Sequence, residues 1–161
     1  MKLPFTALLF TLACSAVFAA PVKPLPPNSL YHLPVTLTDQ DGRASQLADR
    51  RGEPLLITMF FGNCQFVCPR ILEGMKRTEA ALTPTERARV PVLAVTFDPA
   101  RDDIAALKRI ATEHGVDQPA FRLARAEPRE VRKLAATLGI QYRELPGGDY
   151  NHTSVLILLD A

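Results

Sequence analysis

Two cysteines stand close together near the middle of the sequence and could carry chemistry. Cys64 and Cys68 lie in the segment GNCQFVCP, residues 62–69, between an apolar run and an amphipathic stretch. Proline is favoured at the first position of a helix, so Pro69 predicts a helix start with Cys68 as its cap and Cys64 in the preceding loop. The unpaired amides at a helix start favour negative charge, and therefore the thiolate form of a cysteine there. A thiolate attacks disulfides and binds soft metals, so the position suits a reactive pair.

Three chemistries fit this pair of cysteines, which have three residues between them. The pair could form a structural disulfide, as cysteines of exported proteins often do, although so short a loop gives little entropic stabilisation. It could exchange disulfides with a partner, although such enzymes usually have a two-residue spacing. It could also bind a soft metal such as Cu(I) or Zn. The spacing alone does not choose among the three.

A third ligand would favour the metal site, and the sequence has three histidines. His32 lies in a proline-rich segment and His114 ends a predicted helix, so both are interpreted as solvated surface residues. His152 follows a glycine turn and precedes the apolar strand candidate 153–159. A lone histidine is more often structural, but functional groups gather where loops leave strand ends. If strands 54–61 and 153–159 are antiparallel neighbours, His152 comes beside the cysteine loop.

The elements that must position these residues alternate between strands and helices. Strands are predicted over 33–38, 54–61, 90–97, 120–124, 140–144 and 153–159, and helices over 69–82, 101–114 and 128–138. The continuous apolar runs 54–61 and 90–97 are typical of central strands, and 153–159 of a strand buried on both faces. This order predicts an α/β layered domain with parallel strand pairs in its core.

The composition indicates one folded domain. With 161 residues, 47% of them hydrophobic and 22% charged, the chain is neither disordered nor fibrous. Its formal net charge of +2 lacks the basic surplus of a nucleic-acid-binding protein, so no nucleic-acid partner is expected.

The amino end has the pattern of an export signal. Residues 1–20 join one lysine to an apolar run and closing small residues, which is typical of a secretory signal peptide cleaved after Ala19 or Ala20. An uncleaved segment would instead anchor the chain in a membrane. Residues 21–30 contain four prolines and predict a stiff tether, with the folded domain over 31–161. The chain is therefore expected in the periplasm, with no stable membrane insertion once the signal is removed.

Three segments together resemble the SCO/SenC family, over about residues 30–161. They are FFGNCQFVCP, VTFDPARD and NHTS, which begin at residues 60, 95 and 151. The resemblance implies a thioredoxin-like fold with a central mixed sheet flanked by helices. Relatives continue past the final LLDA segment with another strand and a closing helix, which this sequence is expected to lack. Many relatives also have Asp where Asn151 stands, which removes a charge but no ligand.

The same resemblance implies that Cys64, Cys68 and His152 are copper ligands and that Asp98 lies near the site as an auxiliary group. Its family function is that of a copper chaperone in assembly of the copper centre of cytochrome c oxidase. The implied cargo is Cu(I), with Cu(II) left open, and the implied partner is a cytochrome c oxidase subunit or another copper-site protein. The alternative is a thiol–disulfide reductase in which Cys64 and Cys68 act as a redox pair on the cysteines of a partner.

Overall fold

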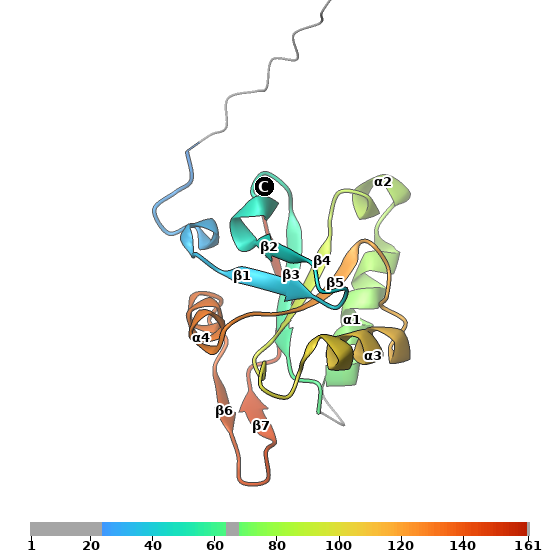
Figure 1. Cartoon of the computed structure of the whole chain (residues 1–161). Coiled ribbons are helices and arrows are strands. Elements are labelled where there is room, and N and C mark those ends of the chain that lie inside the picture. Colours follow the sequence, from blue (N-terminus) through green and yellow to red (C-terminus); the bar gives the residue numbers. More distant parts are fainter. Residues whose placement is uncertain (1–23, 64–67, 161) are drawn as a thin grey trace, which may run out of the picture.

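The computed structural model of the chain describes residues 24–63 and 68–160, and a mixed six-stranded sheet forms its centre (Figure 1). The strands are β1 (Thr36–Asp39), β2 (Ala44–Gln46), β3 (Leu55–Phe60), β4 (Val92–Thr96), β5 (Phe121–Arg125), β6 (Tyr142–Glu144), β7 (Tyr150–His152) and β8 (Ile157–Leu159). The α-helices are α1 (Cys68–Ala81), α2 (Pro84–Arg87), α3 (Ile104–Glu113) and α4 (Pro128–Thr137), and the 3-10 turns are η1 (Leu30–His32) and η2 (Leu47–Arg50).

The order of strands in the main sheet is β2-β1-β5-β4-β3-β8. The three central strands β3, β4 and β5 are parallel, while β1 runs antiparallel to β5 and β8 antiparallel to β3. Every residue of β3 and β4 is buried, as the continuous apolar runs predict for central strands. The remaining strands, β6 and β7, form a separate antiparallel hairpin.

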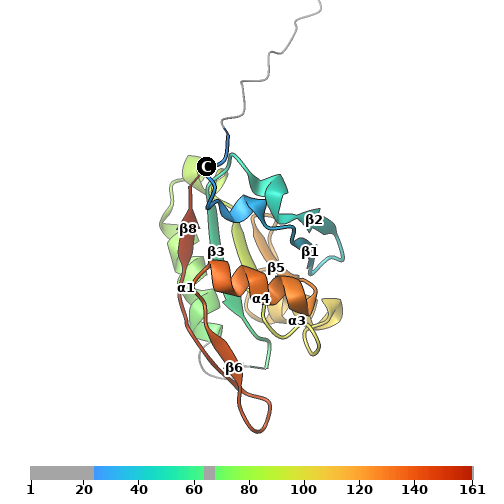
Figure 2. The ribbon, with the colours of Figure 1, turned by 90° about the vertical axis from the view of Figure 1, so that its left-hand side faces the viewer.

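Helices cover both faces of the sheet, which confirms the layered α/β prediction. The helix α4 lies on one side, and α1 and α3 lie on the other (Figures 1 and 2). Their apolar residues recur at helical spacing, so one face of each helix packs on the sheet; in α4 the buried residues are Val131, Leu134 and Ala135. The start of α3 is capped by Asp103, whose carboxylate accepts a hydrogen bond from the Ala106 N–H at 2.8 Å.

The last strand differs from its prediction. The run 153–159 contains only the three-residue strand β8, which lies at the edge of the sheet with β3 as its neighbour. Ile157 and Leu159 are half-buried, whereas Leu158 between them is 65% exposed. The prediction of a strand buried on both faces was therefore wrong, because an apolar run alone does not distinguish an edge strand from a central one.

Short elements escaped prediction altogether. The strands β2 and β7 have three residues each and α2 has four, which is too short for a hydrophobic period to register. Leu25 and Leu30, which belong to the proline-rich segment, pack against the hydrophobic core.

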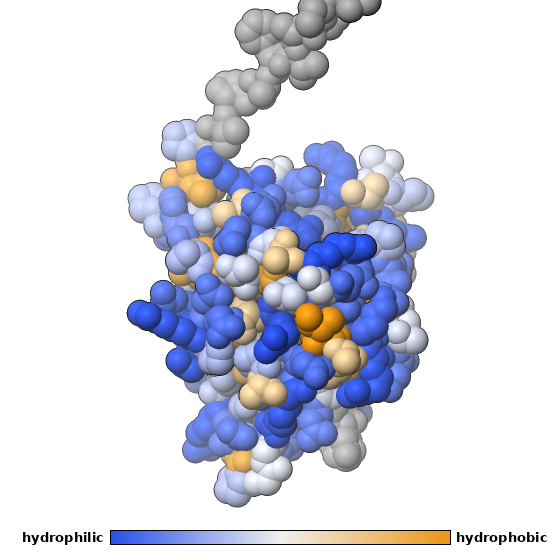
Figure 3. All heavy atoms as spheres, in the orientation of Figure 1, coloured by the Kyte–Doolittle hydropathy of each residue, from blue (hydrophilic) through white to orange (hydrophobic). Residues whose placement is uncertain are grey.

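One face of the molecule is largely polar. Hydrophilic side chains cover most of the face shown in Figure 3, with scattered apolar residues between them. Within residues 24–63 and 68–160, no helix combines the length and the apolar character that a membrane crossing requires.

A buried carboxylate joins two segments: the residues that follow β3 and the turn that follows β4. Asp102 is 3% exposed, and it accepts hydrogen bonds from the Gly62 N–H, at 2.9 Å, and from the Thr96 hydroxyl. The Thr96 oxygen in turn accepts a bond from the Asp98 N–H at 3.0 Å. A Cβ at position 62 would overlap the Asp102 carboxylate and lie 2.6 Å from Cδ1 of Ile110, so this close approach requires glycine.

Replacing Gly62 should therefore destabilise the protein. Gly62→Ala forces the Asp102 carboxylate and Ile110 to move, which should lower the free energy of unfolding by about 1–3 kcal/mol. Gly74→Ala is the matched control. Gly74 lies within α1, and a Cβ there would be 3.8 Å from Cδ1 of Leu156, which is an ordinary van der Waals contact. In the helix this alanine should raise the free energy of unfolding by about 0.5–1 kcal/mol. Urea unfolding of both variants measures the difference, and equal effects would contradict the close packing at Gly62.

Asp102 should also give the stability a characteristic pH dependence. Burial raises the pKa of its carboxyl above the ordinary value, although the hydrogen bonds from Thr96 and Gly62 oppose this shift. The folded state therefore binds the proton more tightly than the unfolded state. The resulting contribution to stability is present below the unfolded pKa, about 4, and is lost as the pH rises through the folded pKa.

The variant Asp102→Asn keeps an oxygen acceptor but removes the titration. Its free energy of unfolding, minus that of the original protein, should increase as the pH is raised above about 4. Asp102→Ala leaves two donors without an acceptor and should lower stability by about 1–3 kcal/mol. Denaturant unfolding at a series of pH values tests both expectations. A pH-independent difference for Asp102→Asn would show that the carboxyl titrates alike in both states.

Candidate functional site

The ring of His152 belongs to a cluster of five rings, which we call the aromatic cluster: Phe61, Phe97, Tyr142, Tyr150 and His152. In the hairpin, Tyr142 lies directly opposite His152, and Tyr150 is on the same face of β7 two residues earlier. The centroid of the His152 ring lies 5.0 Å from that of Phe97 and 5.8 Å from that of Phe61, the latter edge-on. These distances are typical of packed aromatic pairs.

The aromatic cluster lies at the carboxyl ends of two central strands. Phe61 directly follows β3 and Phe97 directly follows β4, and the two rings are 1% and 3% exposed. Figure 1 shows the hairpin β6–β7 at the end of the molecule toward which these strands run. Because Phe61 is three residues before Cys64, the packing brings His152 to the strand end from which the cysteine segment departs.

One ring nitrogen of His152 already has a partner. Its Nδ1 lies 3.2 Å from the carbonyl oxygen of Thr153. A carbonyl oxygen can only accept, so this bond assigns the proton to Nδ1. In the neutral imidazole with this tautomer, Nε2 carries the lone pair that binds metals.

The predicted site residues are described to different extents. Cys64 lies outside the described residues, and Cys68 is seen as the first residue of α1, with its side chain outside the described part. Asp98 and His152 are described, whereas the assignment of Cys64, Cys68 and His152 as one ligand set stays a prediction. Within the described ranges, no group of three or more His, Cys, Asp or Glu could hold a metal ion.

The other histidines lie elsewhere. His32 is exposed, and its Nε2 is 3.0 Å from the carbonyl oxygen of Pro26. His114 is partly exposed at the end of α3.

Asp98 stands one residue after Phe97 and is 5% exposed. Its carboxylate accepts a hydrogen bond from the Arg101 Nε and forms an ion pair with that side chain. The guanidinium reaches on to the hairpin, where its Nη1 donates to the carbonyl oxygen of Gly148. Asp98 therefore lies in a polar network that leads to the element carrying His152.

Sequence reasoning missed both the aromatic cluster and Arg101. The alternation of Tyr150 and His152 in a strand is a signal for a shared face, since side chains two residues apart point the same way. Burial raises the pKa values of the Tyr142 and Tyr150 hydroxyls above their ordinary value.

Comparison with known proteins finds SCO proteins among the relatives of this chain. The SCO1 protein homolog of Bacillus subtilis (strain 168) is 30% identical over 81 residues, which are 50% of this chain and 42% of that protein. The mitochondrial SCO2 homolog of Mus musculus is 33% identical over 79 residues, which are 48% of this chain and 31% of that protein. The matches thus cover less than half the length of these two relatives.

The fold is likewise that of a solved SCO protein. The structure of Bradyrhizobium japonicum ScoI with copper bound has a TM-score of 0.69 and 26% sequence identity, and the match covers 79% of this chain and 81% of that chain. This likeness confirms the expected thioredoxin-like fold, in which helices flank a mixed sheet. The SCO1/SenC family profile matches residues 25–161, and the chain belongs to that family.

Proposed function

We propose that this protein binds copper through Cys64, Cys68 and His152 and delivers it in assembly of the copper centre of cytochrome c oxidase. The observation that carries the proposal is the packing of the His152 ring on Phe61, at the strand end that leads into the cysteine segment. Membership in a family whose relatives include a copper-bound ScoI supports the choice of copper.

The proposed ligands suit monovalent copper. Two thiolates and one imidazole form a soft set, which favours Cu(I) over hard cations. The Nε2 of His152 is the ligand atom, because Nδ1 donates to the carbonyl of Thr153. Because α1 begins at Cys68, the positive end of its helix dipole favours the thiolate form of that cysteine.

Copper is the cargo in this proposal, so it must leave as well as bind. A site with three ligands leaves room for a ligand of the acceptor, and transfer then proceeds by exchange of ligands. His152 is partly exposed and lines an open pocket with Tyr142 and Arg143 of the opposite strand. The acceptor is a cytochrome c oxidase subunit or another copper-site protein, and the periplasm is the proposed place of transfer.

Loss of the imidazole should weaken copper binding but not thiol chemistry. His152→Ala should lower the affinity of the reduced protein for Cu(I) by at least about tenfold, since even the loss of a group supporting a metal ligand costs 10–100-fold. His32→Ala is the control, because that ring is exposed and its Nε2 lies 3.0 Å from the carbonyl oxygen of Pro26. Competition with a chromogenic Cu(I) chelator measures both variants.

Disulfide exchange by His152→Ala should stay close to that of the original protein, since exchange needs only the thiols. An unchanged Cu(I) affinity in His152→Ala would overturn the proposed ligand set. If the protein then also reduced a disulfide of a copper-site partner, the thiol–disulfide reductase would be the better assignment.

Copper loading should depend on the redox state of the cysteines. Forming a disulfide removes two electrons from the pair and leaves neither sulfur as an anionic ligand. Reduced protein should therefore take up one Cu(I) per chain, whereas protein oxidised before titration should take up almost none. Native mass spectrometry counts the bound metal in each state. Equal loading of the oxidised protein would contradict ligation by Cys64 and Cys68.

A further inference from the structure

We infer that Arg101 is a positioning residue that holds the hairpin β6–β7, and with it His152, at the carboxyl ends of β3 and β4. The contacts of Arg101 with the hairpin carry the first part of this inference. The expected effect of Arg101 on copper binding rests in addition on the proposed function.

The hairpin needs such an anchor because no strand pairing fixes it. In the part of the chain that the structure describes, β6 and β7 pair only with each other, and neither joins the six-stranded sheet. The rings of the aromatic cluster hold one face of the hairpin against Phe61 and Phe97. Ring packing resists separation, but most of its stabilisation is apolar burial, which depends less on direction than hydrogen bonds do.

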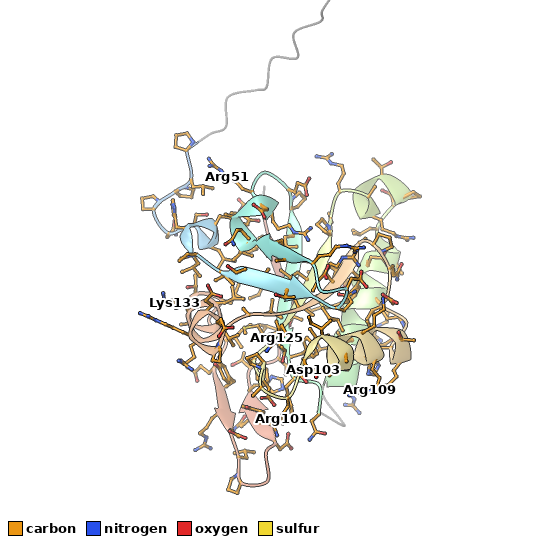
Figure 4. The ribbon with its side chains drawn as sticks, viewed as in Figure 1. Arg51, Arg101, Asp103, Arg109, Arg125 and Lys133 are labelled. Carbon is orange, nitrogen blue, oxygen red and sulfur yellow. The ribbon has the colours of Figure 1, made fainter. Side chains whose placement is uncertain are left out.

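Arg101 provides the directional contacts. Its Nε donates to the carboxylate of Asp98, and its Nη1 donates to the carbonyl oxygen of Gly148 at 2.6 Å. Its Nη2 lies 3.6 Å from Oε1 of Glu144, and the guanidinium carbon lies 5.4 Å from the centroid of the Tyr150 ring. One planar side chain thus contacts the end of β6, the turn and the start of β7, and Figure 4 shows it beside the hairpin.

The turn from Asp98 to Asp102, from which the Arg101 side chain extends, is held by several hydrogen bonds. The Asp98 carbonyl oxygen accepts bonds from the N–H groups of Arg101 and Asp102, at 3.2 and 3.0 Å, which closes the turn after β4. The Asp98 N–H bonds to the buried Thr96 hydroxyl. Arg101 therefore extends from a well-bonded turn in the body of the domain to a hairpin whose strands, among the described residues, pair with each other and not with the main sheet.

Gly148 is shaped to receive the guanidinium. Its φ of +82° lies in the left-handed region, and a Cβ there would lie 2.5 Å from Nη1 of Arg101. The absence of a side chain thus leaves the carbonyl oxygen open to Arg101. Lysine cannot reproduce these contacts, because its single ammonium cannot reach several acceptors in a fixed plane.

The first test uses the metal-free protein. In Arg101→Gln, amide hydrogen exchange over residues 142–152 should become about tenfold faster. The variant loses a charge-assisted hydrogen bond that stabilises the closed hairpin, so the hairpin opens more often. Exchange in α4 should not change. Arg109→Gln is the control, since Arg109 lies on α3 away from the hairpin and pairs with Glu113 at 3.8 Å (Figure 4). Unchanged hairpin exchange in Arg101→Gln would overturn the inference.

A second variant separates charge from geometry. Arg101→Lys keeps the positive charge but not the planar fork, so it should resemble Arg101→Gln in hairpin exchange. Hairpin exchange like that of the original protein in Arg101→Lys would show that charge alone suffices and would overturn the geometric role.

The second test measures Cu(I) affinity in a double-mutant cycle. Arg101→Gln should weaken binding about tenfold, as the loss of a group supporting a metal ligand does, but should have no effect when combined with His152→Ala. An equal loss in both backgrounds would overturn an action through His152. If His152→Ala alone left the affinity unchanged, the proposed copper site would fail, and the exchange experiment would still decide whether Arg101 holds the hairpin.

Discussion

The buried carboxylate of Asp102 is the constraint on which the geometry of the site depends. Burying a carboxylate is unfavourable unless donors surround it, and here the Gly62 N–H and the Thr96 hydroxyl provide them. Because Gly62 is two residues before Cys64, the bond sets where the cysteine segment begins relative to the end of β4. The absence of a side chain at Gly62 allows the carboxylate this close. The raised pKa of Asp102 reflects the unfavourable burial of the carboxylate at the position where it bonds to Gly62 and Thr96.

His152 is positioned by a different kind of force. Its ring packs on Phe61 and Phe97, which are themselves fixed by the strands that precede them. Its Nδ1 lies 3.2 Å from the Thr153 carbonyl oxygen, and among the described residues no hydrogen bond to Nε2 is found. Since Phe61 adjoins Gly62, a shift at the end of β3 would displace the cysteine segment and the histidine together. Backbone hydrogen bonding and ring packing thus act on the same strand end.

The parts of the fold that the sequence predicts are those with long periodic signals. The helices α1, α3 and α4 and the strands β3 and β4 follow from apolar spacing, and the antiparallel pairing of β8 with β3 brings His152 to the expected end of the sheet. The run 153–159 was misjudged because apolar residues look alike in edge and central strands. The contact between Arg101 and Gly148 could not be predicted, because it depends on the register of a short hairpin and on an open glycine turn.

The turn from Asp98 to Asp102 acts on both halves of the proposed site through neighbouring residues. Arg101 reaches toward the hairpin, and Asp102 reaches toward the strand end before the cysteines. The two contacts differ in strength, because the Arg101 side chain is 37% exposed whereas Asp102 is 3% exposed. Water and salt weaken an exposed ion pair far more than a buried bond. The hairpin that carries His152 is therefore held less tightly than the strand end at Gly62.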